Sequence, residues 1–508
     1  MNHWIVVPIV LPALMAPFIV LTLRHDLWLQ RVFSAAATMA LLAVTIGLTV
    51  TAAGGTPEVY ELGNWPAPFG IVLVLDRLSA LMVLLTGLLA VVVVIYAISS
   101  NWDKRGRHFQ ALFQFQLMGV NGAFLTGDVF NLFVFFEVLL IASYGLMLHG
   151  GGAARVRAGV QYVVVNLAGS TLFLVAVGTL YAVTGTLNMA DLAVKVPLVP
   201  AGDQALLRVG ALLLLVVFAV KAALVPIHFW LPGTYANAPA PVAALFAIMT
   251  KVGAYSIIRV FTLAFGGDAG EDAWLAADWL LPAALVTLVI GNLGILGARS
   301  LTRLVCFALI GSMGTLLTAV ALFTPAATAA ALFYLIHSTF AAAALFLVND
   351  QIVERRGSAG DRLVTAPRIA NAGLLAGLFF LAAVGMAGMP PLTGFLGKLM
   401  VLDSARGSDS MATIWAVILV TSLVSIVGFA RAGSLVFWKS AAIPGGEAPH
   451  RPLPGLPIAA AGAMVAGMVA LAVFAGPVTG YLEATSASLY DPSAYIGVVL
   501  GPERLARQ

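Results

Sequence analysis

Glu137 lies near the middle of an apolar run that extends from Val129 to His149. Of the 22 Asp and Glu residues in the chain, only Asp76 and Glu137 fall inside apolar stretches, and Asp76 stands at the start of its stretch. A carboxylate at the centre of a bilayer costs about 2.5–3.5 kcal/mol on insertion scales. We therefore expect Glu137 to take part in moving protons. The alternative is a structural carboxylate that stays paired with a lysine.

Three lysines lie at similar depth and provide a mechanism for that transfer. Lys221 and Lys251 lie within apolar runs, and Lys398 follows a double proline by seven residues. An ammonium that approaches Glu137 stabilises the ionised carboxylate, which releases its proton and regains one when the lysine moves away. The alternative for each lysine is a side chain that extends to the membrane surface, and position alone leaves the depth of Lys398 open.

Two histidines extend this set of ionisable residues. Histidine titrates near neutral pH and can relay protons between other groups. His228 follows Lys221 by seven residues, which places both on one face if the helix continues, and His337 is central in its apolar run. Each histidine could instead be a hydrogen-bonded packing residue. Arg259 lies nearer the outer end of its run, and we expect it to be an interfacial anchor.

The composition of the chain is that of an integral membrane protein. Its 508 residues are 61% apolar and 9% charged, with a mean hydropathy of +1.02, whereas soluble chains carry about 25% charged residues. The formal charge of +4 does not indicate nucleic-acid binding, because basic residues outside the spans are confined to short loops. The single cysteine, Cys306, excludes an internal disulfide and a cysteine-built iron–sulfur or zinc site in this chain. We find no metal-ligand cluster, phosphate-binding loop or Ser/His/Asp arrangement, and expect no cofactor.

These residues must be positioned by membrane-spanning helices, each of which needs about 20 apolar residues. We expect residues 1–508 to form a single, all-α, polytopic membrane domain, and we read the first apolar run as a retained span. The expected spans are about 4–23, 32–53, 77–98, 109–126, 129–149, 158–184, 205–229, 240–265, 274–296, 304–323, 327–347, 371–398, 411–438 and 456–475.

Two of the fourteen expected spans contain proline at depth. Pro226 lies in the seventh span, and Pro390 and Pro391 lie in the twelfth. Proline lacks an N–H group, so both helices should break, and such backbone survives in a membrane only inside protein or beside a wet cavity. The breaks are five spans apart and so run in opposite senses, as in an inverted repeat. Two unrelated proline kinks are the alternative.

The loops predict the orientation. Loops after odd-numbered spans carry three times as many Lys and Arg residues as the even-numbered loops and the tail. The positive-inside rule therefore places the odd-numbered loops in the cytoplasm and both termini outside.

Several segments resemble the D subunit of the multisubunit Na⁺(K⁺)/H⁺ antiporters of the Mrp or Pha type. That family is similar to the proton-pumping membrane subunits of respiratory NADH:quinone oxidoreductase. The segments that carry the resemblance are residues 63–80, 128–137, 221–232, 250–253 and 390–398.

The resemblance implies fourteen helices with five-helix repeats at 109–265 and 274–438, and discontinuous helices 7 and 12. It implies a complex with about six other subunit types in the bacterial inner membrane, coupling H⁺ influx to Na⁺ or K⁺ efflux. It further implies that Glu137 and Lys221 form the key pair, with Lys251 as bridge and Lys398 as outlet lysine.

One departure from the family concerns the region after His337. Many relatives carry a lysine a few residues after this histidine, where this chain has Phe340 followed by four alanines. The relay would then rest on His337, water or the hydroxyls of Ser338 and Thr339. Two alternatives stay open: a pumping subunit of a redox-driven NADH:quinone oxidoreductase-like complex, and a passive scaffold subunit with no ion path.

Overall fold

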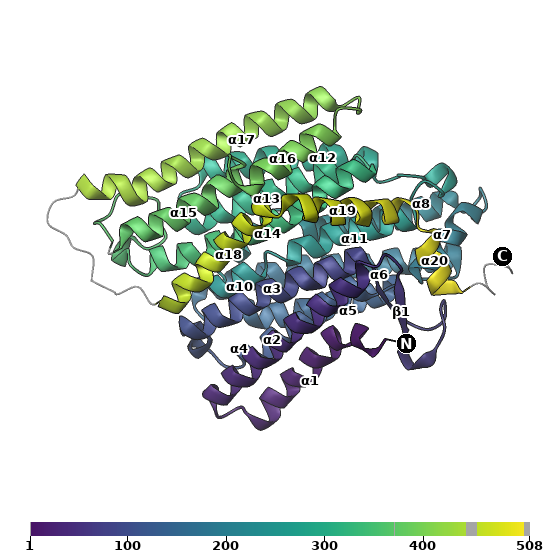
Figure 1. Cartoon of the computed structure of the whole chain (residues 1–508), viewed down its shortest axis with the longest axis horizontal. Coiled ribbons are helices and arrows are strands. Elements are labelled where there is room, and N and C mark those ends of the chain that lie inside the picture. Colours follow the sequence, from purple (N-terminus) through teal and green to yellow (C-terminus); the bar gives the residue numbers. More distant parts are fainter. Residues whose placement is uncertain (1, 370, 443–454, 502–508) are drawn as a thin grey trace.

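The computed structural model describes residues 2–369, 371–442 and 455–501, which form a helical bundle (Figure 1). The comparison of Lys and Arg numbers between loops includes three residues that lie outside these ranges, Arg451, Arg504 and Arg507. The helices of the first half are α1 (Val7–Thr22), α2 (Leu27–Ala52), α3 (Arg77–Ser99), α4 (Phe109–Leu125), α5 (Val129–Met147), α6 (Ala153–Thr184), α7 (Met189–Lys195), α8 (Gln204–Ala222), α9 (Trp230–Tyr235), α10 (Ala240–Leu245) and α11 (Met249–Leu263). Those of the second half are α12 (Ala277–Gly297), α13 (Leu301–Val320), α14 (Pro325–Val353), α15 (Ala372–Ala387), α16 (Thr393–Ser404), α17 (Met411–Gly433), α18 (Gly455–Val473), α19 (Ala475–Tyr490) and α20 (Ser493–Leu500).

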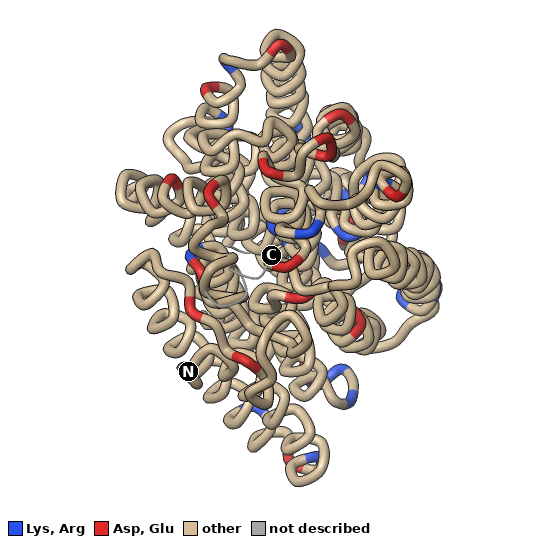
Figure 2. Tube along the Cα trace, turned by 90° about the vertical axis from the view of Figure 1, so that its right-hand side faces the viewer, with Lys and Arg blue, Asp and Glu red and all other residues tan. Residues whose placement is uncertain are grey.

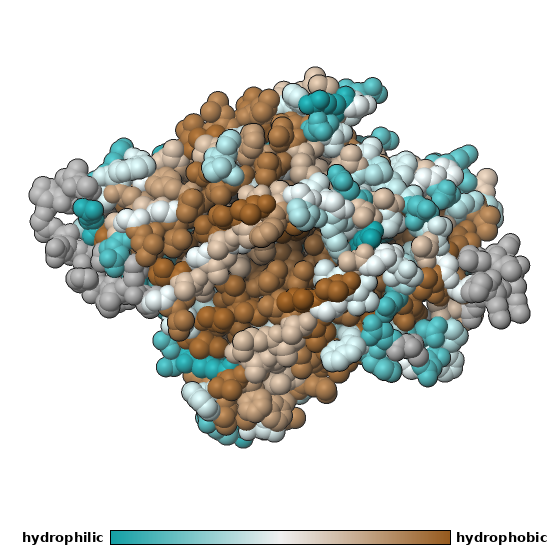
Figure 3. Space-filling view, viewed as in Figure 1, coloured by the Kyte–Doolittle hydropathy of each residue, from teal (hydrophilic) through white to brown (hydrophobic). Residues whose placement is uncertain are grey.

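The bundle has the surface of an integral membrane protein. Among the described residues, 11 helical segments are long and apolar enough to cross a membrane, and α1 and α15 are shorter apolar helices. Figure 3 shows a broad apolar band with hydrophilic side chains toward both ends of the long axis. Each of the fourteen expected spans overlaps one helix or a pair of consecutive helices. The number of membrane crossings itself stays a prediction.

The ends of the bundle differ in charge. Figure 2 shows Asp and Glu on several loops of the end that faces the viewer, where α20 lies. The N-terminal residues lie toward the same end in Figure 1, whereas the connection between α1 and α2 lies toward the opposite end. This arrangement agrees with a chain whose two termini share one side.

Two helices end close to the prolines singled out in the sequence. α8 ends at Ala222, four residues before Pro226, and helical structure resumes in α9 at Trp230. α15 ends at Ala387, and α16 begins at Thr393, after Pro390 and Pro391. The lost backbone donor and the ring of each proline explain why the helices do not run through.

A third interruption was not expected. The range 240–265 was predicted as one continuous helix, but a turn over residues 246–248 separates α10 from α11. There the carbonyl of Phe246 accepts a hydrogen bond from the hydroxyl of Tyr235, at 3.1 Å. Periodicity could not reveal this turn, because no proline or glycine marks it and its acceptor is satisfied by a side chain of α9.

The all-α description needs one correction, a hairpin between α2 and α3. Strands β1 (Glu58–Glu61) and β2 (Val72–Leu75) pair antiparallel, with Glu58 opposite Leu75. Asp76 follows β2 and accepts the Ser79 N–H at 2.8 Å, so the hairpin leads directly into the capped start of α3.

Arg259 is not an interfacial anchor as predicted. It is 3% exposed, and its guanidinium forms a two-pronged ion pair with Asp76, at 2.6 Å and 2.7 Å. The two groups come from α11 and the start of α3, far apart in sequence, which is why span position alone could not pair them.

The centre of the bundle contains α11 and α14. Every residue of α11 is buried, as is nearly all of α14. Helices approach closely at glycine: a Cβ on Gly253 of α11 would lie 2.7 Å from the amide nitrogen of Ala222 in α8. Small residues allow such backbone contact between membrane helices. Gly253 thus brings the helix of Lys251 against the helix of Lys221.

Candidate functional site

Glu137 and Lys221 are linked through polar side chains of α6. The Ser170 hydroxyl donates a hydrogen bond to the Glu137 carboxylate, and the Lys221 ammonium donates one to the Asn166 side-chain oxygen at 2.7 Å. Asn166 and Ser170 are four residues apart, so they lie on one face of the helix. α6 packs against both α5 and α8. The site is therefore a carboxylate and an ammonium, each hydrogen-bonded to a neutral polar side chain on one face of α6.

Glu137 and Lys221 do not form a direct ion pair within 4 Å in the described part of the chain, but each contacts a side chain on one face of α6, one helical turn apart. Lys221 is 7% exposed, and Glu137 is partly exposed. The negative charge is thus near enough to influence the lysine but is not in contact with it. A small movement of either side chain would change their interaction strongly, because charges interact strongly in a low-dielectric interior.

Helix ends position these two groups. α5 begins after Asp128, whose side chain accepts the Asn131 N–H at 2.8 Å and caps the helix that carries Glu137. Asp128 lies between the spans, and burial raises the pKa of its carboxyl to about 6. Lys221 is the last residue but one of α8. The chain then leaves the helix through Ala223, which has a φ of 55°.

The main chain near Pro226 makes hydrogen bonds with side chains other than that of Lys221. The carbonyl of Val220 accepts the Trp230 indole N–H at 3.1 Å. The Val225 N–H donates to the Thr287 hydroxyl at 2.9 Å. The broken segment is thus satisfied by side chains, and Lys221 turns to Asn166.

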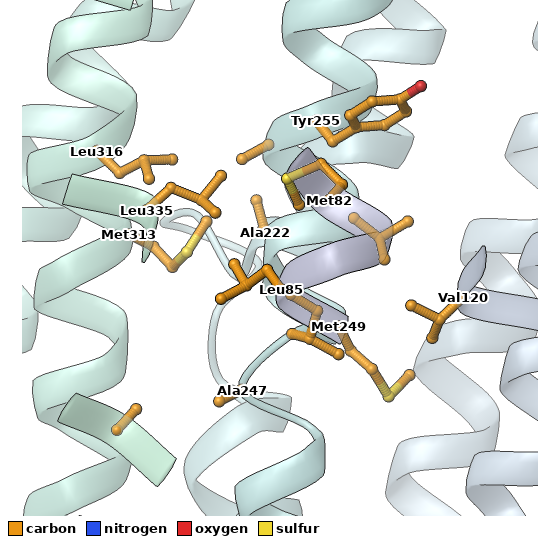
Figure 4. Packing of buried hydrophobic residues seen from close by; sticks show 14 of the residues in the cluster. Met82, Leu85, Val120, Ala222, Ala247, Met249, Tyr255, Met313, Leu316 and Leu335 are labelled. Atoms are coloured by element: carbon orange, nitrogen blue, oxygen red, sulfur yellow. The ribbon is translucent and has the colours of Figure 1, made fainter. Parts of the chain in front are cut away.

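Lys251 lies in the apolar centre. Its side chain is 0% exposed, and the hydrogen-bond contact that the structure gives its ammonium is to the Met313 sulfur, at 3.4 Å. A thioether is a weak acceptor. Figure 4 shows part of the buried apolar core, in which Met313 lies beside Leu335. The Lys251 ammonium therefore has a weak acceptor as its hydrogen-bond contact.

His337 and Lys398 lie at the interruption between α15 and α16. The His337 Nδ1 lies 2.7 Å from the Thr393 hydroxyl, and its buried Nε2 has no hydrogen-bond partner in the described part of the chain. The Lys398 ammonium donates to the Ala387 carbonyl at 2.9 Å and to the Ser422 hydroxyl at 2.7 Å. Lys398, whose depth the sequence left open, is 7% exposed and reaches back to the end of α15.

Three further residues named for a relay make separate contacts. His228 lies in the turn between α8 and α9, and its Nδ1 has no hydrogen-bond partner among the described residues; α8 ends at Ala222, before His228. The Ser338 and Thr339 hydroxyls both donate to the Leu335 carbonyl, at 3.2 Å and 2.8 Å. Each hydroxyl is thus engaged within its own helix.

Four polar residues of the site were not singled out from the sequence. Asn166, Ser170, Thr393 and Ser422 provide the contacts described above. One signal was available: Asn166 and Ser170 continue a four-residue spacing that begins at Tyr162, inside an apolar span. Nothing comparable marks Ser422, because its role depends on how α17 packs against α16.

The transmembrane family described as "NADH:quinone oxidoreductase/Mrp antiporter, TM" matches residues 126–425, more than half of the chain. The chain belongs to this family. The matched region includes Glu137 and the other four ionisable residues of the predicted relay.

Individual relatives cover nearly the whole chain. A protein of Rhizobium meliloti (strain 1021), named as the probable D subunit of a K(+)/H(+) antiporter, is 38% identical over 100% of this chain and 99% of its own length. A protein of Bacillus subtilis (strain 168), named as the D subunit of a Na(+)/H(+) antiporter, is 37% identical over 98% of this chain and 100% of its own. These relatives are named as transporter components rather than enzymes.

Among solved structures, a chain of the Mrp complex from Dietzia sp. DQ12-45-1b is similar over the full fold. Its TM-score is 0.88 and its identity 29%, with 99% of this chain and 100% of that chain covered. The fold is therefore that of the family's membrane subunits.

Proposed function

We propose that this protein is the proton-translocating D subunit of a multisubunit monovalent cation/proton antiporter, and that it couples H⁺ influx to Na⁺ or K⁺ efflux. The observation that carries the proposal is the arrangement of Glu137, Ser170, Asn166 and Lys221, in which an acid and a lysine are close but not in contact. The full-length similarity to antiporter subunits supports it.

The first step is a switch at Glu137. Lys221 is held by Asn166 in one arrangement, and in the other it moves toward the carboxylate. Its approach stabilises ionised Glu137, which gives up a proton, and its return to Asn166 lets Glu137 regain one. Asn166 serves as the neutral resting acceptor, and Ser170 keeps the carboxylate oriented toward α6.

The onward route leads from Lys221 through Lys251 to His337 and Lys398. The hydrogen-bond contact of the Lys251 ammonium is the weak Met313 sulfur, so transfer through this part of the route requires entering water or a shift of the lysine side chain. Lys398 is the outlet lysine, and the His337 Nε2, which has no hydrogen-bond partner among residues 2–369, 371–442 and 455–501, is a group that can take up a mobile proton.

The finer architecture belongs to the same proposal. We infer fourteen membrane helices with inverted repeats at 109–265 and 274–438, because α8 and α15 both end beside prolines in membrane helices. The termini lie outside a bacterial inner membrane, and the partners are other antiporter subunits, the lipid bilayer, H⁺ and Na⁺ or K⁺. The excess of basic residues on the odd-numbered loops supports this orientation.

A redox-driven pumping subunit is the second candidate, because the matching family includes NADH:quinone oxidoreductase subunits. Such a protein would copurify with flavin and iron–sulfur proteins and respond to quinone. Purifying the tagged complex and recording its visible absorption spectrum separates the two functions.

The antiport proposal is tested in everted vesicles that contain the whole complex. Adding Na⁺ or K⁺ should dissipate the pH gradient with the wild type, and Glu137→Gln or Lys221→Ala should abolish the response while assembly survives. Glu483→Gln, which removes an exposed carboxylate on α19, is the matched control and should behave as wild type. Normal exchange by Glu137→Gln or Lys221→Ala removes that residue from the mechanism, and normal exchange by both leaves a scaffold role.

A further inference from the structure

A cavity of about 580 Å³ opens between the α1–α2 connection and the α3–α4 connection, away from the proposed ion path. Its size is typical of small-molecule sites, which measure roughly 300–1,000 Å³. The basic residues of its wall are Arg24, His25, Lys104, Arg107 and His108. We propose that this cavity binds the headgroup of an anionic, hydroxyl-bearing phospholipid, such as phosphatidylglycerol.

The wall carries positive charge that the protein does not neutralise. Arg24, Lys104 and Arg107 are exposed and form no ion pair with any described residue. The acid of the wall, Asp103, is buried and already paired with Arg31 at 2.5 Å. Three cations therefore remain for a ligand, and a phosphodiester supplies the complementary charge.

A buried side-chain oxygen of Gln110 indicates where the hydroxyl groups of the lipid headgroup would bind. Gln110 lines the cavity and is fully buried; its Nε2 donates to Asp103 at 3.1 Å, but its Oε1 has no hydrogen-bond partner among the residues that the structure describes. A buried acceptor left without a donor is costly. The glycerol hydroxyls of phosphatidylglycerol are donors that could satisfy this oxygen while the phosphate contacts the cations.

The position of the cavity favours a lipid over a soluble anion. α2 begins beside it, and Trp28 on the first turn of α2 is 68% exposed, as is typical of aromatic residues at a membrane interface. Phe18 of α1 and Phe33 of α2 are both exposed and lie with ring centroids 5.3 Å apart. The apolar surface of α1 ends at a hydrophilic border (Figure 3), so acyl chains can lie along the helices while the headgroup enters the cavity.

The test measures lipid binding to the purified full-length protein and does not depend on antiport. Native mass spectrometry in mild detergent follows titrations with phosphatidylglycerol and phosphatidylcholine, for wild type and Lys104→Ala/Arg107→Ala. Each cation near a membrane surface contributes enough that losing two should weaken phosphatidylglycerol binding about thirtyfold. Phosphatidylcholine should bind weakly to both proteins.

The matched control removes two exposed cations from outside the cavity, in Arg299→Ala/Arg303→Ala, and should keep wild-type affinity. Gln110→Met should reduce the preference for phosphatidylglycerol over phosphatidic acid, which lacks the glycerol hydroxyls.

Three outcomes overturn the proposal. Equal loss in both double variants would indicate general surface charge. Displacement of the lipid by millimolar inorganic phosphate would indicate a site for a soluble anion. Wild-type lipid binding by Lys104→Ala/Arg107→Ala, with loss of another protein from the complex, would make the cavity a protein contact.

Discussion

Lys221 and Lys398 each lie beside an interrupted helix, but they are held in different ways. Lys221 precedes its interruption and donates to a side chain of another helix, Asn166. Lys398 follows its interruption and reaches back to the main-chain carbonyl of Ala387, with Ser422 as second acceptor. The carboxylate of Glu137 lies on the same face of α6 as the acceptor of Lys221, whereas two neutral acceptors hold Lys398.

This difference assigns different tasks to the two regions. A lysine with one neutral acceptor and an acid nearby has two competing positions, which is what a switch requires. A lysine with two acceptors, one at the carboxyl end of α15 where the helix dipole is negative, has one favoured position. We therefore expect the region around Lys221 to control proton release, and the region around Lys398 to provide a fixed outlet.

Apart from the loss of Glu137 or Lys221 themselves, the largest effect is expected from Gly388→Ala, which changes the second region alone. Gly388 has a φ of 81°, and a Cβ there would lie 2.6 Å from the Lys398 side chain. The added methyl would push the ammonium away from Ala387, and we expect exchange in everted vesicles to fall more than tenfold.

Two substitutions control for this experiment. Gly377→Ala, on the same α15, meets open space and should exchange normally. Ala223→Gly, at the equivalent turn after α8, removes a Cβ from a residue with φ of 55° and should have little effect. Wild-type exchange by Gly388→Ala would show that exchange does not require the contact between the Lys398 ammonium and the Ala387 carbonyl.

The sequence predicted the helices and the ionisable residues better than it predicted their partners. Glu137, Lys221 and Lys251 could be placed on helices because apolar runs and prolines are local features. Asn166 could not be assigned to Lys221, because the rotation of α6 depends on packing between helices. The link from Lys398 to Ala387 depends on the path of the chain through residues 388–392, which periodicity does not describe.

The position of His228 depends in the same way on the path of the chain. Placing it on the face of Lys221 assumed a helix that continues past Pro226, and α8 ends before that point. The hairpin of β1 and β2 was missed because short strands carry a weaker signal than the long apolar helices beside them. The apolar runs and prolines of the sequence thus predicted the helices. The contacts between helices could be described only from the structure.

A smaller effect is expected from Asn166→Asp, in the region around Lys221. This change would hold the Lys221 ammonium in one position, so that it could no longer switch between two acceptors. The new carboxylate would hold the Lys221 ammonium and leave Glu137 without its mobile partner, so we expect about a tenfold loss of exchange, equivalent to about 1.4 kcal/mol. The measurement is again the cation-induced change in the pH gradient, with complex assembly checked by copurification.

Asn292→Asp is the matched control for that change. Both asparagines are buried and donate Nδ2 to the carbonyl four residues earlier, at 2.7 Å for Asn166 and 2.8 Å for Asn292. Only Asn166 has a lysine as hydrogen-bond donor among the described residues. An equal loss in both variants would mean that any buried carboxylate harms the protein, and the switch would lose its support.

The smallest effect is expected from Ser422→Ala in the second region. Lys398 loses one acceptor but keeps the Ala387 carbonyl, so its ammonium should stay in place and exchange should fall about threefold, within the range of one hydrogen bond at about 0.5–1.5 kcal/mol. Ser425→Ala, on the same helix, removes a hydroxyl that bonds only the Ser422 carbonyl and controls for the loss of a buried serine. If Ser422→Ala abolished exchange as completely as Lys221→Ala, Lys398 would behave as a second switch rather than a fixed outlet. The two interruptions would then share one task, with Ser422 taking the part in the second region that Asn166 takes in the first.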